Sequence, residues 1–396
     1  MIRKLIITAF DNFIINTVIE DGRAAEIHCY KTDDLSRIRV GDIYIGKVKK
    51  IAANINAAFI EIAPGVECYY SLEKNRNPYF TNKYGKKSLC IGDELLVQIE
   101  REAVKTKVPT VTSNLNFTGK YMVLTTENKR LGISSKLGKK KQEQLKSLFA
   151  DESFENGGFI VRTNAGNAEK ETILQEKQRL ESQWLHLQKI ADTRKVFSLL
   201  KKSPSEFLLD LQNIYQDGLE AILAEDQALF EDVKTYLNEY QPEDVKKLIH
   251  YQDHLLPLHK LYAIENLLTE CRHERVWMKS GAYLVIQPTE ALTVIDVNSG
   301  KCILKKHTED AFLKINIEAA KEAARQIRLR NLSGIILIDF INMKDEKSLV
   351  SLIEVLRGEL KKDPVTTSFI DVTKLQLVEI TRKKVRKPFH EIFTKA

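Results

Sequence analysis

Hydrophobic and polar positions alternate along the first third of the chain, which predicts β-strands. Apolar runs at residues 5–9 and 13–19 are separated by polar breaks, and Asp21-Gly22 gives a hairpin turn signal before a third run at 24–30. A second block, from about residue 38 to 112, repeats short alternating segments between glycines. Several short strands at this spacing are typical of a small closed barrel.

The rest of the chain follows other periods. From Glu169 to Tyr240 apolar residues recur at intervals of three and four, which predicts helices with boundaries near Pro204 and Pro242. Beyond residue 280 we expect strands at 283–287 and 292–297, a helix from 309 to about 330, a strand at 334–338, a helix over 349–360 and a strand near 369–372. Strand–helix–strand order predicts an α/β layer with a buried sheet.

Two aspartates stand at the ends of apolar strands in this last third. Asp296 follows the run 292–295, and Asp339 follows the run 335–338. The carboxyl ends of strands in an α/β sheet face the functional crevice, and two carboxylates on neighbouring strands repel each other unless a cation lies between them. Mg²⁺ suits this arrangement, because it takes one or two carboxylates and keeps waters for a substrate phosphate.

Asn298 strengthens the case for a metal site. It lies two residues beyond Asp296, so on a continuing strand it shares the face of that residue and could orient a water or a phosphate oxygen. Taken singly, either aspartate is more often a helix N-cap or a turn residue. The pair, with Asn298 and Gly300 alongside, favours the metal.

Aromatic and basic residues gather in the barrel block. Phe59, Tyr69 and Tyr70, with three lysines between positions 47 and 50, fit a sheet that stacks bases on aromatic rings while lysines follow the phosphates. The alternative is that Phe59 is a core residue and the lysines form a solvated face. Elsewhere, Arg162 and Thr163 follow the apolar run 158–161 and could hold a phosphate through charge-assisted hydrogen bonds, although an arginine there is more often a surface charge.

Composition narrows the function classes. The 396 residues are enough for two or three domains, and 61 Lys and Arg against 54 Asp and Glu give a net charge of +7, which permits a polyanionic partner. Five cysteines without a CxxC pair predict no disulfide framework and no structural zinc, and so a reducing cytoplasm. The charged start and the lack of a long uncharged apolar run predict neither a signal peptide nor a membrane span.

Long motifs in the sequence resemble the ribonuclease E/G family. TEALTVIDVNSG (289–300) and INIEAAKEAARQIRLRNLSGIILIDFINM (315–343) closely resemble the catalytic signature of that family. The resemblance extends, in family order, over the segments at 41–62, 117–124, 158–168, 263–268 and 277–292. It therefore covers nearly the whole chain.

The resemblance implies an α+β multidomain fold. An RNase H-like unit would be formed by 1–37 and 206–271, an inserted OB-fold RNA-binding barrel by 38–112, and a 5′-end sensor region by 113–205. A DNase I-like α/β catalytic unit would follow at 272–396. These boundaries are expectations carried over from the family.

The resemblance also implies an activity. It is Mg²⁺-dependent endonucleolytic cleavage of single-stranded RNA, with Mn²⁺ as a substitute ion, in the processing or decay of ribosomal, transfer or messenger RNA. A 5′-monophosphate would stimulate the reaction, which leaves 5′-phosphate and 3′-hydroxyl ends.

By motif position, roles are implied for ten residues of this chain. Asp296 and Asp339 would be the metal ligands, and Asn298 would position the scissile phosphate or a water. A 5′-monophosphate pocket would be formed by Gly119, Val123, Arg162 and Thr163. The barrel would contact RNA through Phe59, Tyr69 and Lys107.

Two departures from the family pattern change what we expect of partners. Family members commonly continue into a CPxC zinc link and a small assembly domain, and this sequence ends at Ala396 without either, so we expect no zinc-linked tetramer, while a homodimer stays open. Residues 362–366 replace an arginine-rich stretch. The rival hypothesis is a non-catalytic RNA-binding protein of ribosomal RNA maturation, which would use the barrel and the basic segment 382–387.

Overall fold

The computed structural model describes residues 2–32, 38–83, 88–103, 107–150, 154, 157–214, 218–300 and 309–392. Helices and strands are mixed throughout, as an α+β fold requires. The chain divides into two compact units, Met1–Asp33 with Asn213–Ala396 (unit 1) and Asp34–Gln212 (unit 2). The four-part division expected from the family is finer than this, and its boundaries stay predictions.

The first sheet of unit 1 has the order β15-β14-β1-β2-β3. Its strands are β1 (Arg3–Phe10), β2 (Phe13–Glu20), β3 (Arg23–Lys31), β14 (Leu219–Ala224) and β15 (Leu248–His250). The first three form antiparallel hairpins, which confirms the predicted strands. Asp21 and Gly22 link β2 to β3 with φ angles of 46° and 80°, in the left-handed region that a tight two-residue hairpin turn requires.

Strand β14 corrects the expectation that the regular structure between Glu169 and Tyr240 is helical. It pairs in parallel with β1 and β15, and most of its side chains are buried. An apolar run of six residues is too short to be distinguished from a helical segment by periodicity alone, and the pairing with β1 decides the outcome. The predicted boundaries are confirmed: α3 (Glu206–Asn213) begins after Pro204, and α4 (Gln227–Tyr240) ends before Pro242.

The second sheet of unit 1 has the order β16-β17-β18-β19-β21-β20. Its strands are β16 (Arg275–Trp277), β17 (Tyr283–Pro288), β18 (Leu292–Asn298), β19 (Gly334–Asp339), β20 (Thr367–Val372) and β21 (Val378–Arg382). β18 and β19 are parallel, and the other neighbours are antiparallel. The predicted strand–helix–strand order is confirmed, with α7 (Glu309–Leu329) and α8 (Glu346–Leu360) as the helices.

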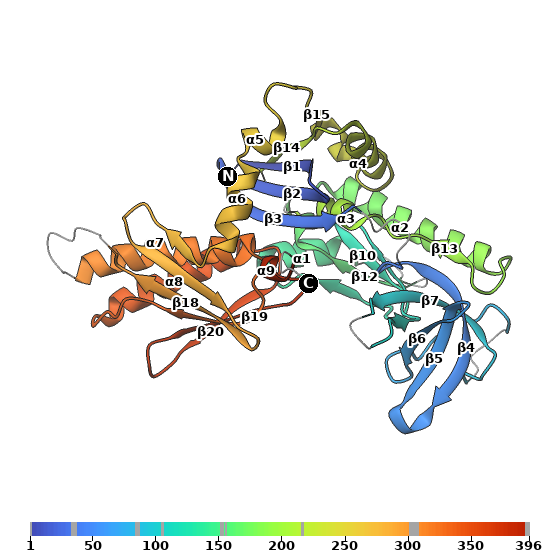
Figure 1. Cartoon of the computed structure of the whole chain (residues 1–396). Coiled ribbons are helices and arrows are strands. Elements are labelled where there is room, and N and C mark those ends of the chain that lie inside the picture. Colours follow the sequence, from blue (N-terminus) through green and yellow to red (C-terminus); the bar gives the residue numbers. More distant parts are fainter. Residues whose placement is uncertain are drawn as a thin grey trace. The chain divides into compact units, whose positions relative to one another are not determined.

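Helices α7 and α8 cover one face of this second sheet (Figure 1). Alternate strand residues, such as Ile295, Ile336 and Ile338, pack in one cluster with Ala323 of α7 and Leu352 of α8. The intervening residues of the same strands are half-buried or exposed. The expected buried sheet is therefore buried on one face, and among the described residues its opposite face remains accessible.

Short helices complete unit 1. They are α5 (Leu258–Leu261), α6 (Ile264–Arg272), α9 (Phe389–Ile392) and the 3₁₀ helix η3 (Pro242–Lys247). Buried residues of α5, α6 and α9 pack with Ile6, Ile15 and Ile27 of the first sheet and with Leu329 at the end of α7. This cluster joins the N-terminal strands to the C-terminal third of the chain within unit 1.

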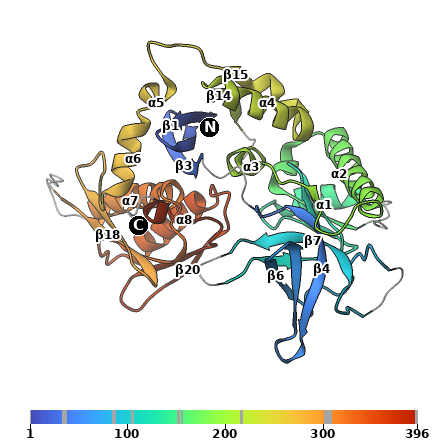
Figure 2. The same cartoon turned by 45° about the vertical axis from the view of Figure 1, so that its right-hand side comes forward.

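Unit 2 contains a closed barrel, which confirms the expectation from the glycine-punctuated strands (Figure 2). Its strands are β4 (Ile43–Ala52), β5 (Ala57–Ala63), β6 (Val66–Ser71), β7 (Glu94–Arg101) and β8 (Thr110–Thr112), with β13 (Leu199–Lys201) paired to β4 and the 3₁₀ helix η1 (Ala53–Ile55) between β4 and β5. The order β4-β5-β6-β8-β7 returns to β4 through the β4–β7 pairing. Five strands in a closed barrel are consistent with an OB-like domain.

A smaller sheet, of order β11-β12-β10-β9, forms the rest of unit 2. Its strands are β9 (Asn116–Thr118), β10 (Met122–Thr125), β11 (Leu131–Ile133) and β12 (Gly158–Val161), and α1 (Lys139–Leu148), α2 (Lys170–Ala191) and the 3₁₀ helix η2 (Thr163–Asn167) accompany them. Trp184 of α2 packs with Phe117 and Phe159 of the sheet in one buried cluster. The amphipathic face of α2 thus becomes the cover of this sheet.

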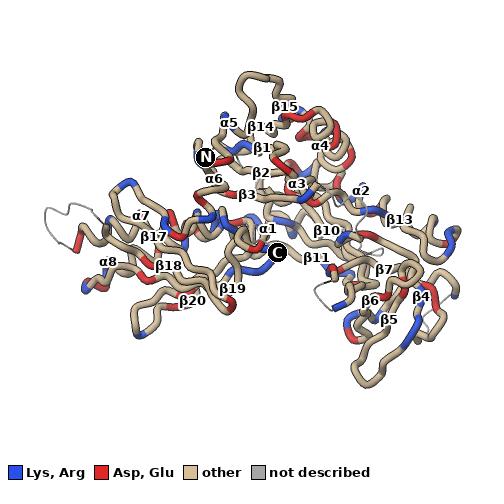
Figure 3. The backbone as a smooth tube through the Cα atoms, viewed as in Figure 1, with Lys and Arg blue, Asp and Glu red and all other residues tan. Residues whose placement is uncertain are grey.

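Both units carry charged segments and helices. Basic and acidic segments are interspersed along both units (Figure 3). None of the helices in the described ranges combines the length and apolar character that a membrane crossing would need.

Candidate active site

Asp296 and Asp339 come together at one edge of the sheet of unit 1. They are directly paired residues of the parallel strands β18 and β19, and each stands at or near the carboxyl end of its strand. Paired residues of neighbouring strands project from the same face, with their Cα atoms about one strand spacing, 4.8 Å, apart. That face is the one opposite to α7 and α8, so both carboxylates lie on the accessible side of the sheet.

Asn298 ends β18 on the same face as Asp296. Its Nδ2 donates a hydrogen bond of 2.6 Å to Oδ2 of Asp296, which fixes the orientation of that carboxylate. The side chain of Asp296 is half-buried and that of Asp339 is exposed. Neither is the N-cap of α8, because Asp345 takes that place and accepts the N–H groups of Lys347 and Ser348. The reading of Asp339 as a helix cap is therefore wrong.

The aspartate pair fits a divalent cation. Within the described part of the chain, neither carboxylate forms an ion pair with a basic side chain, so their mutual repulsion is left for another charge to offset. The described residues contain no group of three or more His, Cys, Asp and Glu side chains that could hold a metal ion. Two carboxylate ligands with remaining places for water are the coordination that Mg²⁺ favours in phosphate chemistry.

Three further side chains on this face were not singled out in the sequence. They are Arg275 and Trp277 on the edge strand β16, and Tyr283 on its neighbour β17. The sequence Arg-Val-Trp does not reveal this, because Val276 and Trp277 are both apolar; the structure buries Val276 and leaves Trp277 exposed. Pairing of β16 with β17 and of β17 with β18, which the sequence does not reveal, brings these three side chains close to Asn298.

In unit 2, the expected 5′-phosphate residues gather around the end of β12. The guanidinium of Arg162 donates to the carbonyl oxygens of Gly119, at 2.7 Å, and of Gln212, at 3.1 Å. The hydroxyls of Thr163 and Ser134 are 2.9 Å apart. Val123 lies half-buried in β10, paired with Ile160 of β12. The structure thus brings Gly119, Val123, Arg162 and Thr163 into one region.

A buried carboxylate that the sequence did not reveal organises this region. Glu176 of α2 accepts the backbone N–H groups of Lys120, Tyr121 and Met122 at 2.8–3.0 Å. Burial raises the pKa of Glu176, against the lowering effect of these hydrogen bonds. A Cβ atom on Gly119 would collide with the Glu176 carboxylate, so glycine at 119 lets the turn close over it.

The barrel places two of its three expected RNA contacts side by side. Phe59 and Tyr69 are directly paired on β5 and β6, both half-buried, with ring centroids 6.3 Å apart at 82°. Phe59 is therefore not a fully buried core residue. Lys107 is exposed, two residues before Pro109, whose carbonyl accepts the N–H of Tyr69.

The expectation that Tyr70 stacks bases together with Tyr69 is wrong. Its ring is buried in the barrel, and its hydroxyl lies 2.8 Å from that of Ser113. Successive residues of a strand face opposite sides, so only Tyr69 of this pair is available on the outer surface. Tyr70 is part of the core and not of an RNA surface.

Within the basic segment 382–387, which a pure RNA binder would use, Lys383, Lys384 and Lys387 are exposed and one residue is buried. Arg382, the first residue of the basic segment 382–387, is buried, and its Nε donates to Asp363 at 2.7 Å while Nη1 donates to Asn331 at 2.6 Å. Asp363 belongs to the segment that replaces the family's arginine-rich stretch. Both residues therefore serve the interior rather than a surface for phosphates.

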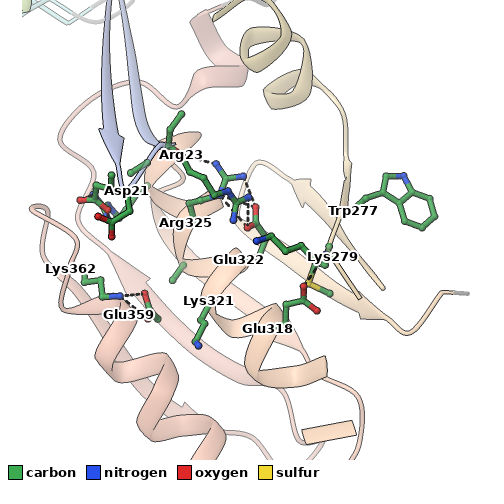
Figure 4. Close-up of a pocket in the computed structure, with 16 residues that line it drawn as sticks. Asp21, Arg23, Trp277, Lys279, Glu318, Lys321, Glu322, Arg325, Glu359 and Lys362 are labelled. Carbon is green, nitrogen blue, oxygen red and sulfur yellow. Dashed lines mark hydrogen bonds and ion pairs between the residues drawn. The ribbon is translucent and has the colours of Figure 1, made fainter. Parts of the chain in front are cut away.

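A cavity of about 500 Å³ in unit 1 is lined by charged groups that pair with each other. Figure 4 shows Arg23 and Arg325 directed at Glu322, and Lys362 directed at Glu359. The carboxylates of Glu322 and Glu359 are therefore already paired with cationic side chains, unlike those of Asp296 and Asp339 on the open face. We therefore place the candidate active site on that face.

The comparisons with known proteins all identify ribonucleases E and G, and they cover most of the chain. A model of the Ribonuclease E/G family matches residues 116–385. Ribonuclease G of Haemophilus influenzae is 30% identical over 390 residues, which cover 95% of this chain and 78% of that protein. Ribonuclease G of Salmonella typhimurium is 31% identical over 392 residues, covering 94% and 78%. Ribonuclease E of Synechocystis sp. is 31% identical over 363 residues, covering 90% and 54%. From the motif order, the family match and these relatives, we conclude that the chain belongs to the ribonuclease E/G family.

Proposed function

We propose that this chain cleaves single-stranded RNA with a divalent cation, Mg²⁺ or Mn²⁺ in its place, held by Asp296 and Asp339. As a member of the ribonuclease E/G family, the chain is an endoribonuclease and acts on RNA. The proposal concerns where and how it does so. The observation that carries it is the direct pairing of the two aspartates on the accessible face of the sheet, with Asn298 bound to one of them.

The aspartates and Asn298 would have different roles in the reaction. Asp296 and Asp339 would hold the cation, which supplies activation of water and offsets the charge that develops at the attacked phosphodiester. Asn298 holds the Asp296 carboxylate in one orientation through its amide N–H and leaves its carbonyl oxygen to orient a water. Attack of water on phosphorus would break the bond from phosphorus to the 3′ oxygen, which takes up a proton, and so leave 5′-phosphate and 3′-hydroxyl ends. The surrounding fold would be DNase I-like, next to an RNase H-like sheet.

Unit 2 would supply the substrate contacts. Phe59 and Tyr69 present ring faces on which bases can stack, and Lys107 adds a positive charge for the backbone. A paired duplex hides its base faces, so these contacts favour single strands. The substrate in the cell would be ribosomal, transfer or messenger RNA, met in the cytoplasm.

The 5′ end of the RNA would be recognised in the second sheet of unit 2. Arg162 is already oriented by two carbonyl groups, and Thr163 offers a hydroxyl beside it. A 5′-monophosphate bound there would stimulate cleavage by holding the substrate at a second point.

Asparagine substitutions test the aspartate pair. We expect Asp296→Asn and Asp339→Asn each to lower kcat on a single-stranded oligonucleotide by at least about 100-fold, because the cation contributes several kcal/mol to the transition state. Binding of the same oligonucleotide should largely survive, and EDTA should stop the wild-type enzyme.

Asp345→Asn is the matched control. It also removes a carboxylate beside β19, but asparagine caps a helix as well as aspartate does, so α8 and the activity should be kept. Normal cleavage by Asp296→Asn or by Asp339→Asn would reject the assignment.

A further inference from the structure

The second sheet of unit 1 (β16-β17-β18-β19-β21-β20) is called the catalytic sheet from here on. Its accessible face carries two rows of side chains that lead to Asp296 and Asp339. Directly paired residues place Arg275, Val285, Asp296 and Asp339 in one row across β16, β17, β18 and β19. The next row is Trp277, Tyr283 and Asn298. Directly paired residues share a face, so both rows project away from α7 and α8. An aromatic and cationic group therefore begins one strand away from Asn298.

Trp277, Tyr283 and Arg275, which we call the aromatic platform, contact one another. The ring centroids of Trp277 and Tyr283 are 5.0 Å apart at 54°, and Cζ of Arg275 lies 4.5 Å from the centre of the Tyr283 ring and 5.8 Å from that of Trp277. The guanidinium is thus held by attraction to both rings. The platform is an ordered surface and not three independent side chains.

The platform does not serve the core. Trp277 is 59% exposed, and its neighbour in the chain, Val276, takes the core position of β16. In Figure 4 the indole of Trp277 points away from the other labelled side chains. A large aromatic ring left in solvent gains little from burial, so the position of Trp277 is not explained by packing of the core.

The aromatic platform lies next to the turn that follows Asn298 and next to a cavity. A Cβ atom on Gly300 would come within 3.2 Å of the Tyr283 ring, so the ring lies against the turn that follows Asn298. On the other side, Arg275, Trp277 and Val285 line a cavity of about 630 Å³ together with Glu270, His273 and Glu274. A volume of this size accommodates a small ligand such as one nucleotide.

We propose that the aromatic platform is a base-stacking subsite for the RNA substrate, occupied by a nucleotide close to the scissile phosphate. This inference rests on the proposed role of Asp296 and Asp339. Every base has a π-face, so stacking on Trp277 and Tyr283 accepts a base irrespective of its identity. The Arg275 guanidinium adds a positive charge that a backbone phosphate can meet through charge-assisted hydrogen bonds.

The location defines which nucleotide is bound. Trp277 and Asn298 are two strand spacings apart, about 10 Å, in the same row. The platform is therefore too far from the aspartates to hold the reacting phosphate and near enough to hold an adjacent nucleotide. Its residues are positioning residues for the substrate.

Tryptophan fluorescence tests the contact without depending on cleavage. The chain has two tryptophans, and Trp184 is buried in unit 2, so Trp277 is the exposed one. In the Asp296→Asn full chain, a single-stranded RNA oligonucleotide should quench the emission, while a blunt RNA duplex should not. The reference is Asp296→Asn with Trp277→Phe, which should lose this response. Equal responses of the two proteins would overturn the proposal.

Kinetics test the positioning role in the enzyme with both aspartates. Trp277→Ala and Tyr283→Ala should each lower kcat/KM by about 5- to 150-fold, the range for one lost base stack, while Trp277→Phe should keep most of it. The matched control is Ile370→Ala, an exposed apolar residue on the opposite edge strand β20, which should leave kcat/KM unchanged.

Abasic substrates locate the contact. One abasic position beside the cut should slow the wild type and have little further effect on Trp277→Ala, because the stack is then lost only once. Independent, additive losses at every position would overturn the proposal. So would a change in the solution mass of Trp277→Ala together with no quenching of Asp296→Asn by single-stranded RNA, because the platform would then join two copies of the chain. Persistent cleavage by Asp296→Asn would instead reject the metal pair, and the fluorescence result would stand apart from it.

Discussion

Single charged residues of unit 1 have their ionisation fixed by buried partners. The carboxylate of Glu20 accepts hydrogen bonds from Arg3, at 2.8 Å, and from Arg328, at 2.9 and 3.0 Å, and Arg328 also pairs with Glu26. Burial alone would raise the pKa of Glu20, but the hydrogen bonds and charges of Arg328 and Arg3 outweigh it and lower the pKa. Burial alone would lower the pKa of Arg328, but the charges and hydrogen bonds of Glu26 and Glu20 outweigh it and raise the pKa.

The lowered pKa of Glu20 predicts an acid-sensitive contribution to stability. A carboxyl with a lower pKa in the folded state than in the unfolded one stabilises the fold above its unfolded pKa of about 4.3, and this contribution is lost as pH falls below that value. Glu20→Gln should therefore lower the free energy of unfolding at pH 7 by about 3–5 kcal/mol, as expected when one partner of a buried ion pair is removed. The difference from the wild type should narrow between pH 5 and pH 3.

Urea denaturation at a series of pH values measures this difference. Glu290→Gln, at an exposed glutamate, is the control and should follow the wild type at every pH. A constant gap between Glu20→Gln and the wild type from pH 7 to pH 3 would contradict the prediction.

At the scale of elements, the turn between β9 and β10 connects Arg162 with α2, in the region proposed to bind a 5′-phosphate. Gly119 provides a carbonyl for Arg162, and Glu176 of α2 ties the following three N–H groups. We expect a 5′-monophosphorylated oligonucleotide to be cut faster than its 5′-hydroxyl form. Arg162→Lys should lower the ratio of these two cleavage rates by about 10- to 100-fold, because a lysine cannot keep both carbonyl contacts while it binds phosphate.

Paired oligonucleotides that differ only at the 5′ end check this preference. Arg130→Ala, which removes an exposed arginine near β11, should keep the ratio of the two rates. Equal rates for the two oligonucleotides in the wild type would argue against a phosphate pocket at Arg162.

The elements that the sequence predicted are those whose pattern is local. The hairpins β1–β3, the barrel strands and the order β18-α7-β19-α8 follow from alternation, turn residues and periodicity. β14 was missed because its six residues are interpretable as strand or helix until β1 is placed beside them. The aspartate pair could be anticipated from two strand ends, whereas the aromatic platform depends on the antiparallel register of β16 and β17, which alternation alone does not fix.

At the scale of the whole molecule, four buried clusters of the described residues each lie within one unit. The cores of the catalytic sheet and of the first sheet lie in unit 1, and those of the barrel and of the smaller sheet lie in unit 2. Unit 2 is one continuous segment, 34–212, inserted between two parts of unit 1. The chemistry proposed for Asp296 and Asp339 therefore belongs to unit 1, and most of the proposed substrate contacts belong to unit 2.

This division predicts that residues 34–212 fold and bind RNA without cutting it. A segment with its own hydrophobic clusters can fold alone, so the fragment should unfold cooperatively in urea. It should bind a single-stranded oligonucleotide in fluorescence anisotropy, and Phe59→Ala with Tyr69→Ala should weaken binding by about 5-fold or more, as loss of base stacking implies. Incubation with Mg²⁺ should leave the oligonucleotide intact, since Asp296 and Asp339 are absent. Cleavage by the pure fragment, or equal binding by the double variant, would contradict the division of labour between the units.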